Sequence, residues 1–125
     1  MHNPEKKILA VVADLFFSVK IAETAKKAGI ALEFVTNGEA VMGKAKDGPC
    51  LIIFDLNFDA VEPLRLLREL KADTETRDIS LLGYLSHVQA DLKREAEATG
   101  CDAVMARSAF SMNLPQILKR HAGIP

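Results

Sequence analysis

The sequence predicts an α/β fold in which a parallel five-stranded sheet carries helices on both faces. Five short apolar runs alternate with five helical patterns, and the most apolar runs, such as 50–54, contain no polar residue. Alternating strands and helices are typical of a parallel sheet. Strands buried on both faces appear as continuous apolar runs. The 125 residues suit a single domain, 1–125, with its core between about residues 6 and 120.

The predicted strands share a high content of branched apolar residues and lie near 7–13, 31–36, 50–55, 79–85 and 102–106. The second alternates apolar and polar residues from Leu32 to Thr36, as expected of a half-exposed edge strand. Right-handed crossovers and the strong apolar character of strands one, three and four favour the order 2-1-3-4-5. This is the flavodoxin-like order rather than the dinucleotide-binding arrangement.

Glycine and proline mark the ends of the predicted helices. The helices are expected at 16–28 before Gly29, from Asn37 to Gly48, from Pro63, up to Gly100, and from Asn113 with Pro115.

Polar side chains follow four of the predicted strands. Asp55 closes the apolar run 50–54, and Asp14, Ser86 and Arg107 follow strands one, four and five. Because parallel strands end at one edge of the sheet, these residues are expected to meet there, where open α/β sheets bind ligands.

Two adjacent carboxylates repel each other unless a cation lies between them. Mg²⁺ prefers oxygen ligands, so Asp14, Asp55 and the carbonyl of Asn57 are a candidate metal site. Asp55 could then accept a phosphoryl group, to which Ser86 would donate a hydrogen bond and Arg107 two N–H groups. The alternative is that Asp14 and Ser86 cap helices and that Arg107 forms a surface ion pair.

Four short motifs occur in this order: Val11–Asp14, Ile52–Asn57, Leu85–Ser86 and Met105–Phe110. Their order and spacing resemble the receiver domain of bacterial two-component response regulators. The resemblance implies that Asp55 accepts phosphate from a histidine kinase or a phosphotransfer protein. It also implies that Asp14 holds Mg²⁺ and that Ser86 moves toward the phosphate.

The chain departs from the receiver pattern at three places. Ala13 replaces an acid that helps to hold the metal, which predicts weakened Mg²⁺ binding. Arg107-Ser108 replaces the usual lysine-proline pair, and Val104 replaces the aromatic residue that switches. The chain therefore resembles an atypical receiver.

Two functions follow from this resemblance and stay open. The first is a phosphorelay switch with Asp55 as phosphoacceptor, whose only enzymatic chemistry is phosphate acceptance and self-dephosphorylation. The alternative is a phosphorylation-independent pseudo-receiver that acts as a constitutive interaction module. Receivers commonly signal through a surface that corresponds to about 88–120, and the resemblance is also compatible with a homodimer.

Charge and hydropathy exclude other classes. The net charge is −1 without a long basic run, which disfavours nucleic-acid binding. No apolar stretch approaches the ~20 residues of a membrane span, and the N-terminus lacks a signal core, so a cytoplasmic protein is expected. Cys50 and Cys101 are expected in separate strands, beyond disulfide reach. Phe16 and Phe17 follow the first strand, and either cap the core or form an apolar rim that seats a partner.

Overall fold

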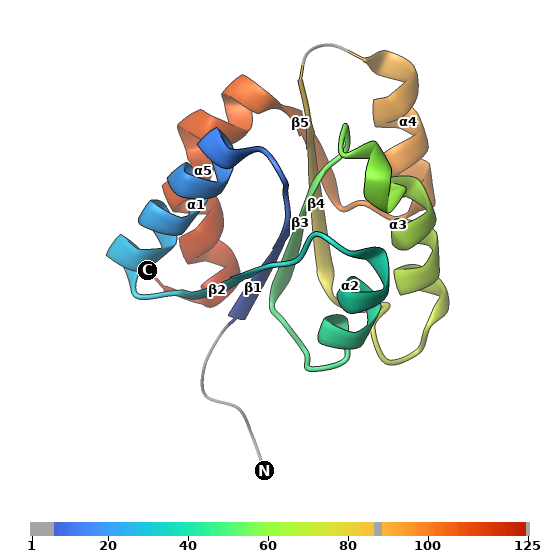
Figure 1. Cartoon of the computed structure of the whole chain (residues 1–125), viewed down its shortest axis with the longest axis horizontal. Coiled ribbons are helices and arrows are strands. Elements are labelled where there is room, and N and C mark those ends of the chain that lie inside the picture. The colour runs from blue at the N-terminus through green and yellow to red at the C-terminus, as the bar shows by residue number, and fades with distance from the viewer. Residues whose placement is uncertain (1–6, 87–88, 125) are drawn as a thin grey trace.

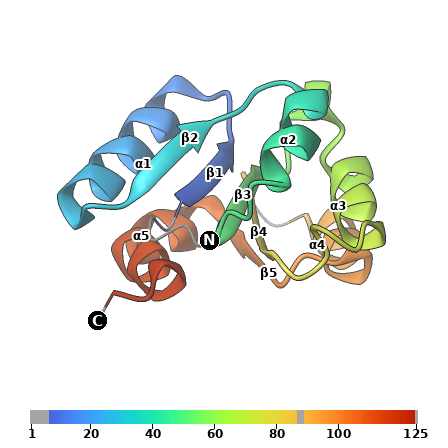
Figure 2. The ribbon, with the colours of Figure 1, turned by 90° about the horizontal axis from the view of Figure 1, so that it is seen from below.

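The computed structural model describes residues 7–86 and 89–124. The remaining residues of the predicted 1–125 domain, including residue 88 at the start of the predicted output surface, lie outside the described residues. The sheet stands between two helical layers (Figure 1 and Figure 2). Helices α1 (Leu15–Ala28) and α5 (Arg107–Ala122) cover one face. Helices α2 (Gly38–Ala45), α3 (Pro63–Ala72) and α4 (Ala90–Thr99) cover the other.

The sheet confirms the predicted topology. Its strands are β1 (Lys7–Val11), β2 (Ala31–Phe34), β3 (Leu51–Asp55), β4 (Ser80–Leu85) and β5 (Ala103–Ala106). They run parallel in the order β2-β1-β3-β4-β5, with β2 at an edge as expected. A short 3₁₀ turn, η1 (Asp59–Val61), lies between β3 and α3.

Successive side chains of a strand point to opposite faces, so the sheet divides the core in two. We call the part beneath α2, α3 and α4 the aliphatic half, because leucine, isoleucine and valine dominate it. We call the part beneath α1 and α5 the aromatic half, because Phe17, Tyr84 and Phe110 pack together there. Burying a large apolar side chain contributes about 1.5–3 kcal/mol, so both halves stabilise the fold.

The largest correction to the sequence prediction concerns α5. This helix begins at Arg107 and not at Asn113, and Pro115 lies inside it. Proline usually marks a helix start because it has no N–H to donate. Here Phe110 and Leu114 are spaced by one helical turn and both are fully buried, so tertiary packing keeps the turn before the proline helical. Strands one and two are also shorter than predicted, ending at Val11 and Phe34.

The predicted end of the second helix at Gly48 is wrong, because α2 ends at Ala45, but other helix ends follow the predicted signals. Gly29 ends α1 in the left-handed conformation, with φ 71°, which glycine adopts without strain. Pro63 is the first residue of α3, and Gly100 follows the last residue of α4. Asn37 accepts hydrogen bonds from the backbone N–H groups of Glu39 and Ala40 and caps α2.

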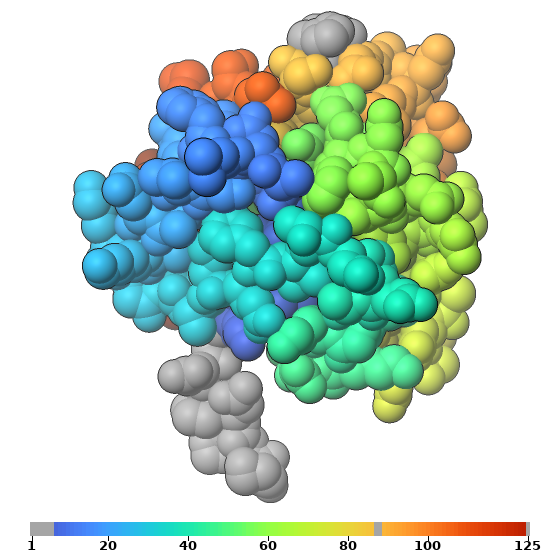
Figure 3. Space-filling view, in the orientation of Figure 1, coloured from blue at the N-terminus to red at the C-terminus, as the bar shows by residue number. Residues whose placement is uncertain are grey.

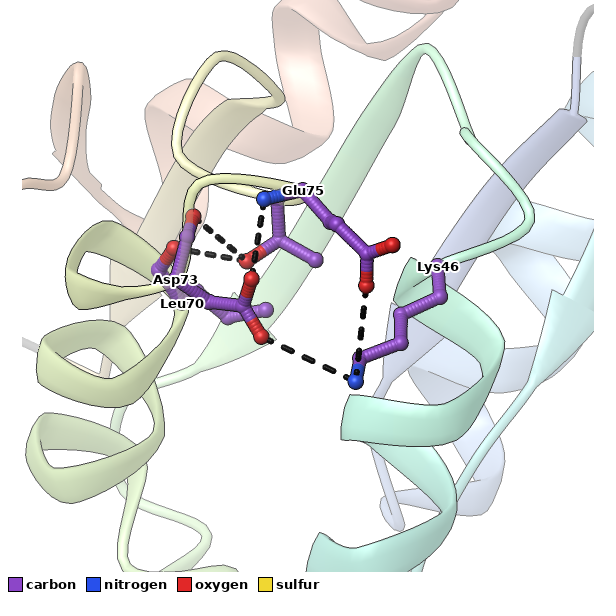
Figure 4. A network of polar contacts seen from close by, with 5 residues as sticks. Lys46, Leu70, Asp73 and Glu75 are labelled. Carbon is purple, nitrogen blue, oxygen red and sulfur yellow. Dashed lines mark hydrogen bonds and ion pairs between the residues drawn. The ribbon is translucent and has the colours of Figure 1, made fainter.

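A surface network joins the end of α2 to the loop after α3 (Figure 4). The Lys46 ammonium lies 3.8 Å from Asp73 and 3.6 Å from Glu75. Beneath it the buried Thr76 hydroxyl donates to the Leu70 carbonyl at 2.7 Å. Exposed ion pairs contribute little, so the link from α2 is weak, whereas the buried hydroxyl bond holds the loop to α3.

Within residues 7–86 and 89–124, no helix is long and apolar enough to cross a membrane. No disulfide joins Cys50 and Cys101, which pack into opposite halves of the core. Burial raises the pKa of the Cys101 thiol to about 12.

Candidate functional site

The candidate site lies at the carboxyl edge of the sheet, and the strand register explains why its residues gather there. Leu85 of β4 pairs with Ala106 of β5, so Ser86 and Arg107 leave the sheet from neighbouring positions. Val11 of β1 pairs with Phe54 of β3, which Asp55 follows directly. The start of α1, the segment after β3 and the start of α5 lie at this end of the molecule (Figure 3).

Asp55 is the buried acid of the site, with 7% of its surface exposed. Its Oδ1 atom accepts a hydrogen bond from the Asn57 backbone N–H at 2.9 Å. Burial raises the pKa of Asp55, and the nearby carboxylates of Asp14 and Asp59 add to this rise. The Asn57 hydrogen bond and the charge of Arg107 oppose it. A neighbouring cation therefore favours the ionised carboxylate.

Asp14 has two roles, one for each carboxylate oxygen. Oδ1 accepts a hydrogen bond from the Phe17 backbone N–H at 3.1 Å and caps α1. Oδ2 lies 3.9 Å from Nη2 of Arg107. The capping alternative is therefore correct for Asp14, and the same side chain also faces the site.

Arg107 reaches across the site from the first turn of α5. Its guanidinium carbon lies 5.0 Å from the centroid of the Phe17 ring, within the range of a cation–π contact. Its Nε atom is buried and has no hydrogen-bond partner among the described residues. The guanidinium is thus held mainly by the ring and by Asp14.

Asn57 connects the two loops that border the site. Its side-chain oxygen accepts a hydrogen bond from the Ser86 backbone N–H at 2.8 Å, and its side-chain nitrogen donates to Gln89 at 3.0 Å. Its carbonyl oxygen accepts from the Asp59 N–H at 3.0 Å. These bonds fix the loop after β3 against the loop after β4.

Ser86 is exposed and belongs to the site through its backbone bond to Asn57. The alternative in which Ser86 caps the fourth helix is wrong, because Gln89 occupies the cap position of α4. The phosphate contact of its hydroxyl stays a prediction.

Tyr84 is a residue of the site that the sequence reasoning missed. It pairs with Asp55 in the sheet register, and its ring stacks on Phe110 with centroids 4.7 Å apart. Its hydroxyl is buried without a hydrogen-bond partner among the described residues. Burial raises the pKa of Tyr84, and the charge of Asp55 adds to the rise. The alternation of side chains along β4 could have placed Tyr84 on the same face as Asp55, but only with the register known.

The two phenylalanines after β1 have different environments. Phe17 is 4% exposed and caps the aromatic half of the core, which confirms the first of the two alternatives. Phe16 is 72% exposed and, with the 77% exposed Leu15, leaves an apolar rim beside the acids. The partner-seating role of that rim stays a prediction.

Carboxylate oxygens are the ligands that Mg²⁺ prefers, but the carboxylates of Asp14 and Asp55 are not arranged as a metal site in this structure. Three of the four oxygens of Asp14 and Asp55 already face the Phe17 N–H, the Asn57 N–H or the Arg107 guanidinium. Among the described residues, no group of three acidic, histidine or cysteine side chains could hold a metal ion. Ala13 contributes no further side-chain oxygen to this edge of the sheet.

Val104 takes the place of the aromatic residue in the receiver pattern. It is buried in the aliphatic half and has no large ring to move between buried and exposed positions.

No family model matches the sequence, and the search of curated proteins found no match. Solved structures do match over nearly the whole chain. A response regulator from Hahella chejuensis has a TM-score of 0.83 at 18% identity, covering 94% of this chain and 95% of that one. The chemotaxis response regulator CheY4 of Vibrio cholerae has a TM-score of 0.79 at 19% identity, covering 94% and 98%.

The chain has the receiver fold. A third match is the receiver domain of a sensor histidine kinase from Pseudomonas aeruginosa, with a magnesium ion coordinated in its active-site cleft. Its TM-score is 0.80 at 18% identity, and 95% of this chain and 98% of that one are covered. Because these identities are low, the likeness establishes the receiver fold, and the function of this chain depends on its own residues.

Proposed function

We propose that this chain is a signal-transduction receiver module in which Asp55 accepts a phosphoryl group. One observation carries the proposal: a buried carboxylate stands at the carboxyl edge of a receiver fold, with an arginine from another element close to it. The Oδ1 atom of Asp55 accepts the Asn57 N–H, so Oδ2 is the oxygen that we expect to react.

The proposed step is a phosphoryl transfer. An oxygen of the Asp55 carboxylate forms a bond to phosphorus while the bond between phosphorus and the donor's leaving atom breaks. With an acyl phosphate, the leaving carboxylate keeps the bonding electron pair. The guanidinium of Arg107 stabilises the phosphoryl oxygens by charge and by parallel N–H donors. Hydrolysis of the acyl phosphate at Asp55 would restore the acid.

The proposed donor is a histidine kinase or a phosphotransfer protein, since the fold is that of receivers linked to such kinases. The apolar rim at Leu15 and Phe16 borders the acids and would contact that donor. The proposed output surface is residues 89–120, which include α4, β5 and most of α5.

One observation favours the alternative, a phosphorylation-independent interaction module. Arg107 already faces Asp14, and its charge opposes the rise in the pKa of Asp55, so the acids have a cation before any phosphate arrives. In that case the same helical surfaces would bind partners constitutively.

Intact-mass measurement after incubation with a small acyl phosphate separates the two functions. We expect the wild-type chain to gain the mass of one phosphoryl group and Asp55→Asn to gain none. Asp59→Asn is the matched control, because Asp59 is an exposed carboxylate in the same loop and should not affect the gain. Absence of any gain with acyl phosphates and phosphoramidates would leave the interaction module.

A further inference from the structure

The acid pair of this site requires a positive charge nearby. Asp55 is buried, and both its burial and the charge of Asp14 disfavour its ionised form. A site built from two carboxylates therefore needs a cation from solution or from the chain itself.

Arg107 supplies that charge from within the chain. Its Nη2 atom lies 3.9 Å from Oδ2 of Asp14, and its charge also acts on Asp55. The guanidinium carries one permanent charge, because an arginine does not deprotonate in proteins.

The position of Arg107 is set by aromatic packing. Phe17 lies 5.0 Å from the guanidinium carbon, and its ring is fixed by Tyr84 at 5.2 Å and Phe110 at 6.1 Å between centroids. The first turn of a helix is an unfavourable place for a cation, because the positive end of the helix dipole lies there. The ring and the acids, and not the helix, therefore account for the arginine's orientation.

A divalent ion bound at these acids would have to share them with this arginine. Two backbone N–H groups and the guanidinium face three of the four carboxylate oxygens, and Ala13 offers none. Mg²⁺ needs near-octahedral oxygen coordination and binds usually through one or two carboxylates with several waters. A guanidinium among those waters would repel the ion.

We infer that Arg107 is a resident cation that takes the place of magnesium at Asp14 and Asp55, so that Mg²⁺ and the Arg107 side chain compete for the same carboxylates. The metal-binding part of this inference is independent of phosphorylation. Its extension, that Asp55 receives a phosphoryl group without a divalent metal, rests on the proposed function.

Titration of the unphosphorylated chain with Mg²⁺ alone tests the competition. Isothermal titration calorimetry gives the dissociation constant, and the fluorescence of Tyr84, the single tyrosine in a chain without tryptophan, reports binding beside Asp55. We expect Arg107→Gln to tighten Mg²⁺ binding by about ten-fold or more, since a unit charge a few ångströms from a divalent ion is only partly screened. Circular dichroism of each variant verifies that it is folded.

Arg120→Gln is the matched control. Arg120 is an exposed arginine in the last turn of the same helix, about 20 Å from Arg107 at 1.5 Å per residue. Arg120→Gln removes the same net charge as Arg107→Gln but far from the acids, so the Mg²⁺ affinity of Arg120→Gln should equal that of the wild type. Ala13→Asp, which adds an oxygen donor, should tighten binding further in the Arg107→Gln background. Equal Mg²⁺ affinities for the wild type and Arg107→Gln would overturn the inference.

Phosphorylation by an acyl phosphate in EDTA and in Mg²⁺ tests the extension. We expect the wild type to be modified at similar rates in both, and Arg107→Gln to depend on Mg²⁺. A wild type that reacts only with Mg²⁺ would overturn the extension while the proposed function stands. If no variant reacts under either condition, the proposed function fails, and the Mg²⁺ titration still decides the competition.

Discussion

Both halves of the core consist mainly of buried apolar side chains, but their buried polar atoms differ in hydrogen bonding. In the aliphatic half, the buried Thr76 hydroxyl donates a 2.7 Å hydrogen bond to Leu70. In the aromatic half, the Tyr84 hydroxyl and the Arg107 Nε atom are buried without hydrogen-bond partners in the described part of the chain. An unpaired buried polar group costs about 1–3 kcal/mol. The difference indicates that the aliphatic half is arranged for stability and that the aromatic half positions the groups of the site.

The strongest test compares a large residue from each half. We expect Phe110→Ala to lower the free energy of unfolding by about 3–5 kcal/mol and Leu67→Ala by about 2–5 kcal/mol, because both are fully buried. Urea unfolding measures both. Only Phe110→Ala should also alter Mg²⁺ affinity, because Phe110 supports Phe17 beneath Arg107. An equal change in Leu67→Ala would contradict the division between the halves.

A second test adds volume to the aliphatic half. A Cβ atom at Gly83 would lie 2.8 Å from a terminal carbon of Leu56, which follows Asp55. Overpacking of this kind costs about 1–3 kcal/mol, so Gly83→Ala should shift the urea midpoint to lower concentration. Leu56→Ala removes the contacting atoms. The loss of stability in the Gly83→Ala/Leu56→Ala double variant should therefore be smaller than the sum of the losses in the two single variants. Simple additivity would show that Leu56 does not explain why a glycine is needed here.

The two buried hydroxyls give a sharper comparison with smaller effects. Thr76→Val removes a bonded hydroxyl and leaves the Leu70 carbonyl with one fewer donor, which should cost about 1 kcal/mol. Tyr84→Phe removes an unpaired hydroxyl and should be neutral or stabilising by up to about 1 kcal/mol. Thermal unfolding of both variants measures the difference. A clear loss of stability in Tyr84→Phe would show that its hydroxyl has a partner in solution.

The mildest test follows the charge of Asp55 with pH. The native state raises the pKa of Asp55 above its ordinary value of 3.8, so it binds this proton more tightly than the unfolded chain does. Wild-type stability should therefore fall as pH rises from about 4 through the raised pKa. Asp55→Asn should be more stable than the wild type at pH 7, and its advantage should shrink at low pH. Urea unfolding across this range measures the difference in stability, with the exposed Asp47→Asn as control. A difference that stays constant with pH would contradict the shift.

Local sequence patterns were sufficient for most of the fold. The apolar run 50–54 identified the central strand, and Gly29, Pro63 and Gly100 marked helix ends correctly. They failed at α5, where Asn113 and Pro115 predicted the helix start although the helix begins at Arg107, eight residues before the proline. A proline signal is local, whereas the packing of Phe110 against Tyr84 depends on a strand distant in the sequence.

By itself, the sequence determined that Asp14, Asp55, Ser86 and Arg107 follow strands and so share one edge of a parallel sheet, because side-chain alternation and helix signals are local properties. Only the tertiary structure decided how these groups pair. The Arg107 guanidinium lies over the Phe17 ring, and Tyr84 is buried beside Asp55. One oxygen of Asp14 caps α1, and the other faces Arg107. These contacts join residues from different elements, so they depend on strand register and rotamers that no local pattern encodes.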